Sequence, residues 1–190
     1  MPSQLHYKNQ EGFTLLEMVV SIGIFSVVVI SAIGIMINVS NGMTKAANIQ
    51  AVQDNIRFSL ELMTKEMRTG ENFTLTSVCG LAGSEISFDA TSGRRVYFLD
   101  ATNKQIMRAK TDITASDCNG STGKVTPFTA NEVFVDRLRF IPHGTIIGPS
   151  DGQPTITVVL TTRSKSPKIQ LETSMSIQTT VIQRLRDTAP

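Results

Sequence analysis

Residues 12–37 read GFTLLEMVVSIGIFSVVVISAIGIMI and carry a single charged side chain, Glu17. From Phe13 to Ile37 the segment holds 25 residues. With a helical rise of about 1.5 Å per residue, this length gives about 37 Å, enough to cross a hydrocarbon core of roughly 30 Å. We therefore expect a membrane-spanning helix over residues 13–37. Because an ionised side chain is costly in lipid, Glu17 is a candidate functional residue.

Residues 1–12, MPSQLHYKNQEG, are polar and predict a short leader ahead of the apolar segment. The apolar run is longer than the roughly 7–15 residues of a secretory signal, and no A-x-A-like cleavage site follows it. We therefore expect a helix that is retained. The leader has a small net positive charge, because Lys8 and the initiator amine carry two positive charges against the one negative charge of Glu11. By the positive-inside rule, we therefore expect the N-terminus in the cytoplasm.

Helical spacing resumes after the apolar segment, with Gly42 as a candidate kink. Apolar residues recur every three or four positions, which predicts one apolar helix face. They are Ile49, Val52, Ile56, Leu60, Met63 and Met67. Gly70 is a typical helix stop, with Arg68 in the last turn. No proline interrupts residues 13–69, so we predict one long helix whose second part, residues 38–70, is amphipathic.

Residues 71–190 are rich in Thr, Ser, Gly and β-branched residues, which predicts a globular β-rich domain. Residues 100–103 predict a hairpin connection, and stretches near 116–124 and 148–154 predict loops. The candidate strands are 85–89, 95–100, 105–110, 132–142, 155–162 and 168–184. Strands that follow a helix indicate an α+β fold, with an antiparallel sheet covered on one face by the amphipathic half-helix.

The sequence contains two cysteines, Cys79 and Cys118, and neither has the CxxC spacing of a zinc or redox motif. If this part of the chain is exported, we expect a disulfide between them. Such a bridge closes a loop of about 40 residues, worth roughly 3.9 kcal/mol in the chain-entropy model. Two unpaired, partly buried thiols are the alternative.

The net charge of +2 is spread over the chain, with small basic groups at 94–95, 163–168 and 184–186. None is interleaved with aromatic residues, so no nucleic-acid partner is expected. Asn72 and Asn119 begin sequons that matter only in a host with glycosylation machinery.

The sequence predicts no enzyme, no cofactor and no metal site. The two histidines, His6 and His143, form no pair for a metal, and no nucleophile motif is present. His143 lies between Pro142 and Gly144, which favours a turn. The acidic stretches 117–119 and 151–152 lack EF-hand spacing and are interpreted as surface loops.

The stretch Gly12-Phe13-Thr14-Leu15-Leu16-Glu17, with the apolar helix behind it, resembles the class III signal of type IV pilins and pseudopilins. The resemblance implies that a prepilin peptidase cuts after Gly12 and methylates the new amine of Phe13. It also implies that Glu17 pairs with the Phe13 amine of a neighbouring subunit. Each charge alone is costly in lipid, so this pairing would fix the axial register between apolar helices.

Segments further along resemble the W-type minor pilins and J-type pseudopilins, which implies a minor subunit with the pilin fold. Two features depart from the family pattern: the leader is less basic than usual, and Gly34 stands where many major pilins carry a helix-bending proline. The segments that carry the resemblance are 52–57, 60–70, 95–99, 105–108, 131–133, 138–140 and the end at 184–186.

We therefore expect a non-enzymatic minor pilin or pseudopilin that is incorporated into, or primes, a type IV pilus-like filament. Its expected partners are prepilin peptidase, other pilin or pseudopilin subunits, the inner-membrane assembly platform, and membrane lipid before assembly. Its expected location is the inner membrane in a single pass, with the globular domain periplasmic or extracellular, and then a pilus or pseudopilus. The alternatives are a pseudopilin of a type II secretion system and a non-polymerising, membrane-anchored extracytoplasmic binding domain.

Overall fold

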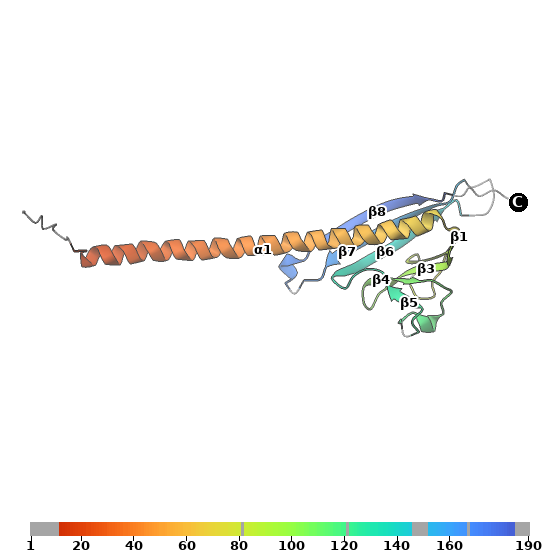
Figure 1. The fold of residues 1–190 in the computed structure, drawn as a ribbon, viewed down its shortest axis with the longest axis horizontal. Helices are drawn as coiled ribbons and strands as arrows, with labels where there is room; N and C mark the ends of the chain where they lie inside the picture. The colour runs from red at the N-terminus through yellow and green to blue at the C-terminus, as the bar shows by residue number, and fades with distance from the viewer. Residues whose placement is uncertain (1–11, 81, 121, 146–151, 167, 185–190) are drawn as a thin grey trace, which may run out of the picture. The chain divides into compact units, whose positions relative to one another are not determined.

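The computed structural model describes residues 12–80, 82–120, 122–145, 152–166 and 168–184 (Figure 1). Helix α1, Leu15–Arg68, has 54 residues and continues through Gly42 without a break. It begins two residues later and ends one residue earlier than predicted. The chain divides into two compact units, residues 1–43 and 44–190, and α1 contributes to both.

Five antiparallel strands form the first sheet, with consecutive strands as neighbours. A bulge interrupts the pairing of the first two strands between Glu71 and Thr74, and Asn72 there has a φ of 55°. The strands are β1 (Glu71–Leu75), β2 (Glu85–Ala90), β3 (Gly93–Asp100), β4 (Gln105–Ala109) and β5 (Val125–Pro127).

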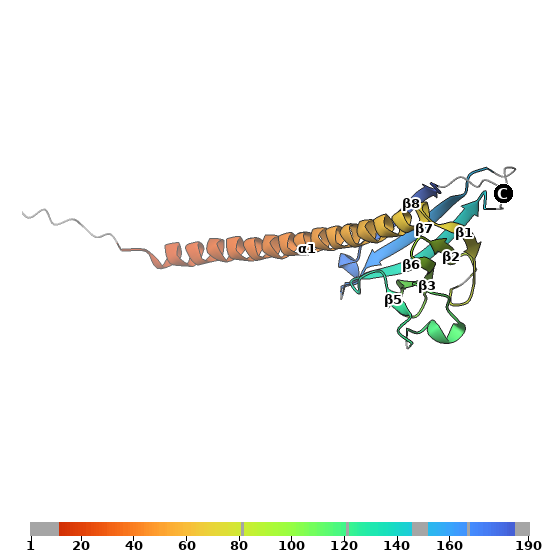
Figure 2. The same cartoon turned by 45° about the vertical axis from the view of Figure 1, so that its right-hand side comes forward.

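The second sheet is an antiparallel meander of β6 (Val133–His143), β7 (Thr155–Ser164) and β8 (Ser174–Ile182). In β7 buried residues alternate with half-buried ones, as expected when one face of a sheet meets the core. Figure 2 shows β6, β7 and β8 side by side from a second angle.

The main hydrophobic core lies between the second half of α1 and both sheets. The helix contributes Val52, Ile56, Met63 and Met67, all at most 1% exposed. The first sheet contributes alternate residues of β2 and β3, while the second contributes the inner faces of β6, β7 and β8. The sheet residues include Ile86, Phe88, Tyr97, Ile106, Leu138, Phe140, Val158 and Leu160. The α+β fold, with a long helix packed on antiparallel sheet, is confirmed.

A second, smaller core covers the opposite face of the first sheet. Cys79 and Ile113, from the loops after β1 and β4, pack against its buried side chains, which are Val96, Phe98, Met107, Ala109 and Val125. The first sheet is therefore buried on both faces, which explains why residues 85–88 of β2 are buried without alternation.

Two expectations about the β-rich part were wrong. The sequence predicted one sheet, but the strands form two, and β1 and β5 were not predicted at all. The last strand begins at Ser174, whereas residues 168–184 were predicted, because β7 ends at Ser164, whose N–H donates to the Thr173 carbonyl. With no further β7 residue to pair with, the preceding segment forms a 3-10 turn over Ile169–Leu171. The connection at 100–103 is confirmed.

Candidate processing and assembly site

The described chain begins at the predicted cleavage site, immediately before α1. Gly12, Phe13 and Thr14 lie outside any helix or strand, and the Phe13 side chain is 78% exposed. A side chain at Gly12 would meet no atom within 4 Å. The backbone between Gly12 and Phe13 is therefore open to an enzyme and takes no part in helical hydrogen bonding. Residues 1–11, the rest of the predicted leader, lie outside the described part of the chain.

Thr14 caps the helix and so sets the position of Glu17. The Glu17 N–H donates to Thr14 Oγ1 at 3.2 Å, and the Met18 N–H donates to the Thr14 carbonyl at 3.2 Å. The pattern Thr-x-x-Glu at residues 14–17 is that of a capping box. Sequence reasoning missed this role, although the Thr14 and Glu17 spacing was a sufficient signal.

Glu17 sits in the first turn of α1, where a carboxylate complements the positive end of the helix dipole. Its side chain is exposed, and among the described residues no Lys or Arg forms an ion pair with it. In the uncut chain the Phe13 nitrogen is a peptide amide without charge. A positive charge at Phe13 that could pair with Glu17 would therefore require cleavage after Gly12.

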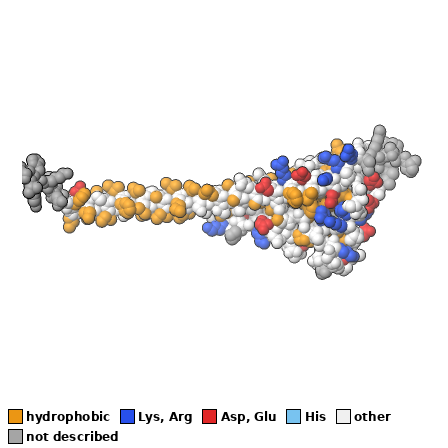
Figure 3. Space-filling view, in the orientation of Figure 1, with side chains coloured by type: hydrophobic (Ala, Val, Ile, Leu, Met, Phe, Trp, Pro, Cys, Tyr) orange, Lys and Arg blue, Asp and Glu red, His pale blue; other side chains and the backbone are white. Residues whose placement is uncertain are grey.

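Behind the motif, α1 exposes nearly every apolar side chain that it carries as far as Met43. Figure 3 shows hydrophobic side chains along this part of the helix, whereas charged side chains gather over the globular unit. Ser26 and Ser31 donate their hydroxyls to the carbonyls of Ile22 and Val27 at 2.7 and 2.8 Å. These hydroxyls are thus satisfied within the helix, as lipid requires. Within the described residues, α1 is the one helix long and apolar enough to cross a membrane.

A disulfide joins Cys79 to Cys118 in the globular unit. The Glu85 carboxylate, fully buried, holds the first of these cysteines: it accepts the N–H groups of Cys79 and Gly80, each at 2.7 Å, and the Thr76 hydroxyl at 2.6 Å. These three donors meet the hydrogen-bonding needs of the buried carboxylate oxygens. Beside the bridge lies a hollow of about 320 Å³ that the 100–103 turn also lines.

Asp117 organises the loop that carries Cys118. Its carboxylate accepts the Thr114 N–H and hydroxyl, each at 2.9 Å, and pairs with the Lys124 ammonium at 3.2 Å. The backbone hydrogen bond from Thr114, followed by those from the Thr122 and Thr114 side chains, holds the pKa of Asp117 well below its usual range. The described residues of the loop predicted at 116–124 therefore contain a buried charge, Asp117.

A polar cluster joins α1 to the first sheet. Glu66 accepts the Tyr97 hydroxyl at 2.5 Å and faces Arg95 Nε at 3.4 Å and Arg108 Nη1 at 3.5 Å. Burial, together with the hydrogen bond to Glu66, raises the pKa of Tyr97 well above its usual value. Tyr97 is therefore neutral at any physiological pH, which suits a donor to the Glu66 carboxylate.

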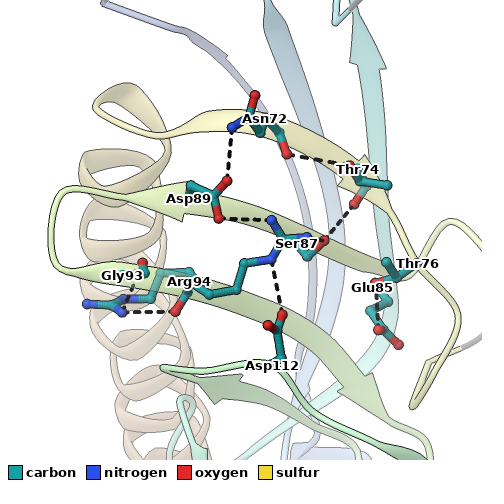
Figure 4. A network of polar contacts seen from close by, with 10 residues as sticks. Asn72, Thr74, Thr76, Glu85, Ser87, Asp89, Gly93, Arg94 and Asp112 are labelled. Carbon is teal, nitrogen blue, oxygen red and sulfur yellow. Dashed lines mark hydrogen bonds and ion pairs between the residues drawn. The ribbon is translucent and has the colours of Figure 1, made fainter.

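The Asn72 sequon takes part in a surface network on β1, β2 and β3 (Figure 4). Asn72 Nδ2 donates to Asp89 at 3.0 Å, and Arg94 pairs with Asp89 at 2.9 Å and with Asp112 at 3.4 Å. The hydrogen bonds from Arg94 and then Asn72 lower the pKa of Asp89. The network ties the bulged edge strand β1 to its neighbours.

No group of three or more His, Cys, Asp or Glu in the described residues could hold a metal ion. His143 is exposed at the end of β6, the strand Val133–His143, where a turn was predicted. His6 and residue 151 lie outside the described residues.

A family model described as the prokaryotic N-terminal methylation motif matches residues 7–33, which include Gly12, Phe13 and Glu17. No curated protein and no solved structure matches the chain. The motif implies processing by a prepilin peptidase and assembly with other pilin subunits, and it points to a structural subunit and not to an enzyme. Together with the long apolar N-terminal helix, it supports a type IV pilin-like or pseudopilin protein that is anchored in a membrane.

Proposed function

We propose that this chain is a minor pilin or pseudopilin that assembles through its N-terminal helix into a type IV pilus-like filament, or primes one. The observation that carries the proposal is the first part of α1. Its apolar side chains, most of them within the matched residues 7–33, are exposed along the helix and are covered by nothing in the described chain. Such a surface needs lipid before assembly and neighbouring helices afterwards.

The second part of the proposal concerns the charge that cleavage after Gly12 creates at Phe13. It converts the neutral amide of Phe13 into an amine, which N-methylation leaves basic. That amine and Glu17 then carry opposite charges at the start of the same apolar helix. Pairing between subunits offsets part of the cost of each charge in a low-dielectric environment and selects one register. Apolar contacts alone distinguish registers poorly.

The proposed topology places the leader, residues 1–12, in the cytoplasm and residues 13–37 in the inner membrane. The amphipathic part, 38–70, and the β-rich part, 71–190, then lie in the periplasm or outside the cell. That compartment is oxidising, which agrees with a Cys79–Cys118 bridge. Inside a cytosol the same two cysteines would remain reduced.

N-terminal mass spectrometry of the protein, extracted from membranes and from sheared filaments, tests the processing step. We expect a chain that begins with methyl-Phe13; a chain with an intact Met1 would contradict the proposal. Gly12→Val should abolish cleavage because a β-branched side chain obstructs the scissile bond. Gly34→Ala is the matched control, since a side chain meets no atom within 4 Å at either position.

Glu17→Gln tests the assembly step, because it removes the charge and keeps the size of the side chain. We expect membrane insertion to persist or improve and the amount in sheared filaments to fall. Glu61→Gln, an exposed carboxylate further along α1, should leave incorporation unchanged. If filaments contained normal amounts of the Glu17→Gln variant, the register role would be wrong. If the variant stayed in the membrane while processing was complete, the assembly role would stand.

A further inference from the structure

A groove of about 400 Å³ lies at the C-terminal end of α1. Its walls are Glu61, Thr64, Lys65, Arg68, Thr69 and Arg184. Arg184 follows β8, and its N–H donates to the Arg68 carbonyl at 2.8 Å, which holds this segment beside the helix end. Figure 3 shows Lys and Arg side chains gathered over this end of the globular unit.

The cations of the groove are not needed to terminate the helix. Basic residues in a last turn often bind the free carbonyls or complement the helix dipole. Here the carbonyls of residues 65 and 66 accept the Thr69 hydroxyl, at 3.5 and 3.3 Å. The carbonyls of residues 67 and 68 accept the N–H groups of Gly70 and Arg184. The last turn is therefore satisfied by neutral donors.

These cations are also free of ion pairs within the described residues. Lys65, Arg68 and Arg184 are exposed, and none is among the eight ion pairs of the described chain. The adjacent carboxylate, Glu66, faces the first sheet instead, where it contacts Tyr97 and two arginines. Among the described residues, Glu61 is the one acidic side chain that lines the groove.

Other arginines of the globular unit stabilise the fold through ion pairs. Arg94, Arg95, Arg108 and Arg163 each pair with a carboxylate and join strands to one another or to α1. The groove thus differs from these sites in two respects: three cations line one concave surface, and no carboxylate of the described fold neutralises them beyond Glu61. Such an arrangement is suited to binding an anion.

We propose that this groove binds the phosphate group of a phosphorylated ligand. Two guanidinium groups and one ammonium group against one carboxylate leave a charge of about +2, which matches the roughly −1.5 to −2 of a phosphate monoester at pH 7. Arginine forks bind phosphate oxygens bidentately, and lysine adds a point charge. The groove, about 400 Å³, exceeds a single phosphate and has room for the group that carries it.

The phosphate monoester has two sources that share this chemistry: a soluble phosphorylated metabolite and the headgroup of phosphatidic acid. The groove lies wholly within residues 44–190. The proposal is therefore independent of whether the N-terminal helix enters a filament, and the two proposals fail separately.

Calorimetric titration of the full chain in neutral detergent tests the groove, with a hexose 6-phosphate in one arm and micelles doped with phosphatidic acid in the other. We expect saturable binding in at least one arm. Arg68→Gln and Arg184→Gln should each raise the Kd about tenfold, since each removes a charge-assisted contact. Their thermal midpoints should match the parent chain because the bond between residues 184 and 68 is made by backbone atoms.

Arg137→Gln is the matched control, since Arg137 is an exposed arginine of β6 without an ion pair in the described residues. Binding of the hexose phosphate supports a soluble ligand, and binding of phosphatidic acid alone supports a headgroup. Absence of binding in both arms overturns the proposal. So does an equal loss in Arg137→Gln, or tighter binding of a duplex oligonucleotide without terminal phosphates.

Discussion

The two halves of α1 form one helix but differ in the burial of their apolar side chains. In the second half, Met63 and Ile56 are fully buried against the sheets, and the charged side chain of Arg57 lies exposed between them. In the first half, Val27, Val28 and Ile30 are all more than half exposed. Hydrophobic burial is the dominant favourable term in folding, so the second half has its partner within the chain. The first half requires a partner from outside.

The largest expected effect concerns the globular unit alone. Replacing both Cys79 and Cys118 by Ser removes the bridge over the second core. We expect a loss of about 3.9 kcal/mol in the free energy of unfolding, in the chain-entropy model. Denaturant unfolding of the full chain in detergent, followed by circular dichroism, measures this loss. Membrane insertion should be unchanged; a reduced membrane fraction of still-folded protein would show that the two halves are coupled.

Met63→Ala tests whether the second half is held by its own core. Met63 is fully buried, so truncation should cost about 3 kcal/mol through lost burial and a cavity. Phe58→Ala is the control on the same helix, because Phe58 is 62% exposed and should change stability by less than about 0.5 kcal/mol. Thermal melts of both variants measure the contrast. Similar losses in the two would contradict the assignment of the buried face.

Val28→Arg and Phe58→Arg make a similar change on the two halves. The two side chains have similar exposed fractions, 58% and 62%. An arginine at the centre of a membrane segment costs about 2.5 kcal/mol or more, so Val28→Arg should lower the membrane-inserted fraction. Phe58→Arg should not. Carbonate extraction of membranes measures both, and equal insertion of the two variants would argue against a spanning segment at residue 28.

The smallest effect is a pH dependence inside the globular unit. Because hydrogen bonds lower the pKa of Asp117 in the folded state, its contribution to stability is present above the unfolded pKa of about 4. That contribution is lost as the pH falls further toward the folded value. Unfolding midpoints measured between about pH 5 and pH 2 should therefore fall less steeply in Asp117→Asn than in the parent chain. Parallel curves would contradict the role of Asp117.

The sequence predicted α1 closely because its signals are local. The apolar run, the spacing from Ile49 to Met67 and the stop at Gly70 each specify a helix without knowledge of distant residues. The strands β2, β3, β4, β6 and β7 were predicted within a few residues for the same reason. The short strands β1 and β5 were missed, because each holds few apolar residues and exists through pairing with a neighbour.

The features that the sequence did not predict depend on tertiary contacts. Alternation tells which residues share a face but not which strands pair, so the division into two sheets was not predictable from it. Glu85 reads as a polar strand residue, yet it is buried because Cys79, Gly80 and Thr76 donate to it. The groove cations belong to two segments that are over 100 positions apart in the sequence. The basic group noted at 184–186 therefore did not predict that Arg184 would lie near Lys65.

We propose that other subunits cover the first half of α1 after processing. The most direct measurement places a photo-crosslinking amino acid at Val28 and irradiates sheared filaments from cells that express the chain. We expect a covalent adduct between this chain and another pilin-type subunit, identified by mass spectrometry. Adducts with lipid alone, from a chain that is fully processed and abundant, would contradict it.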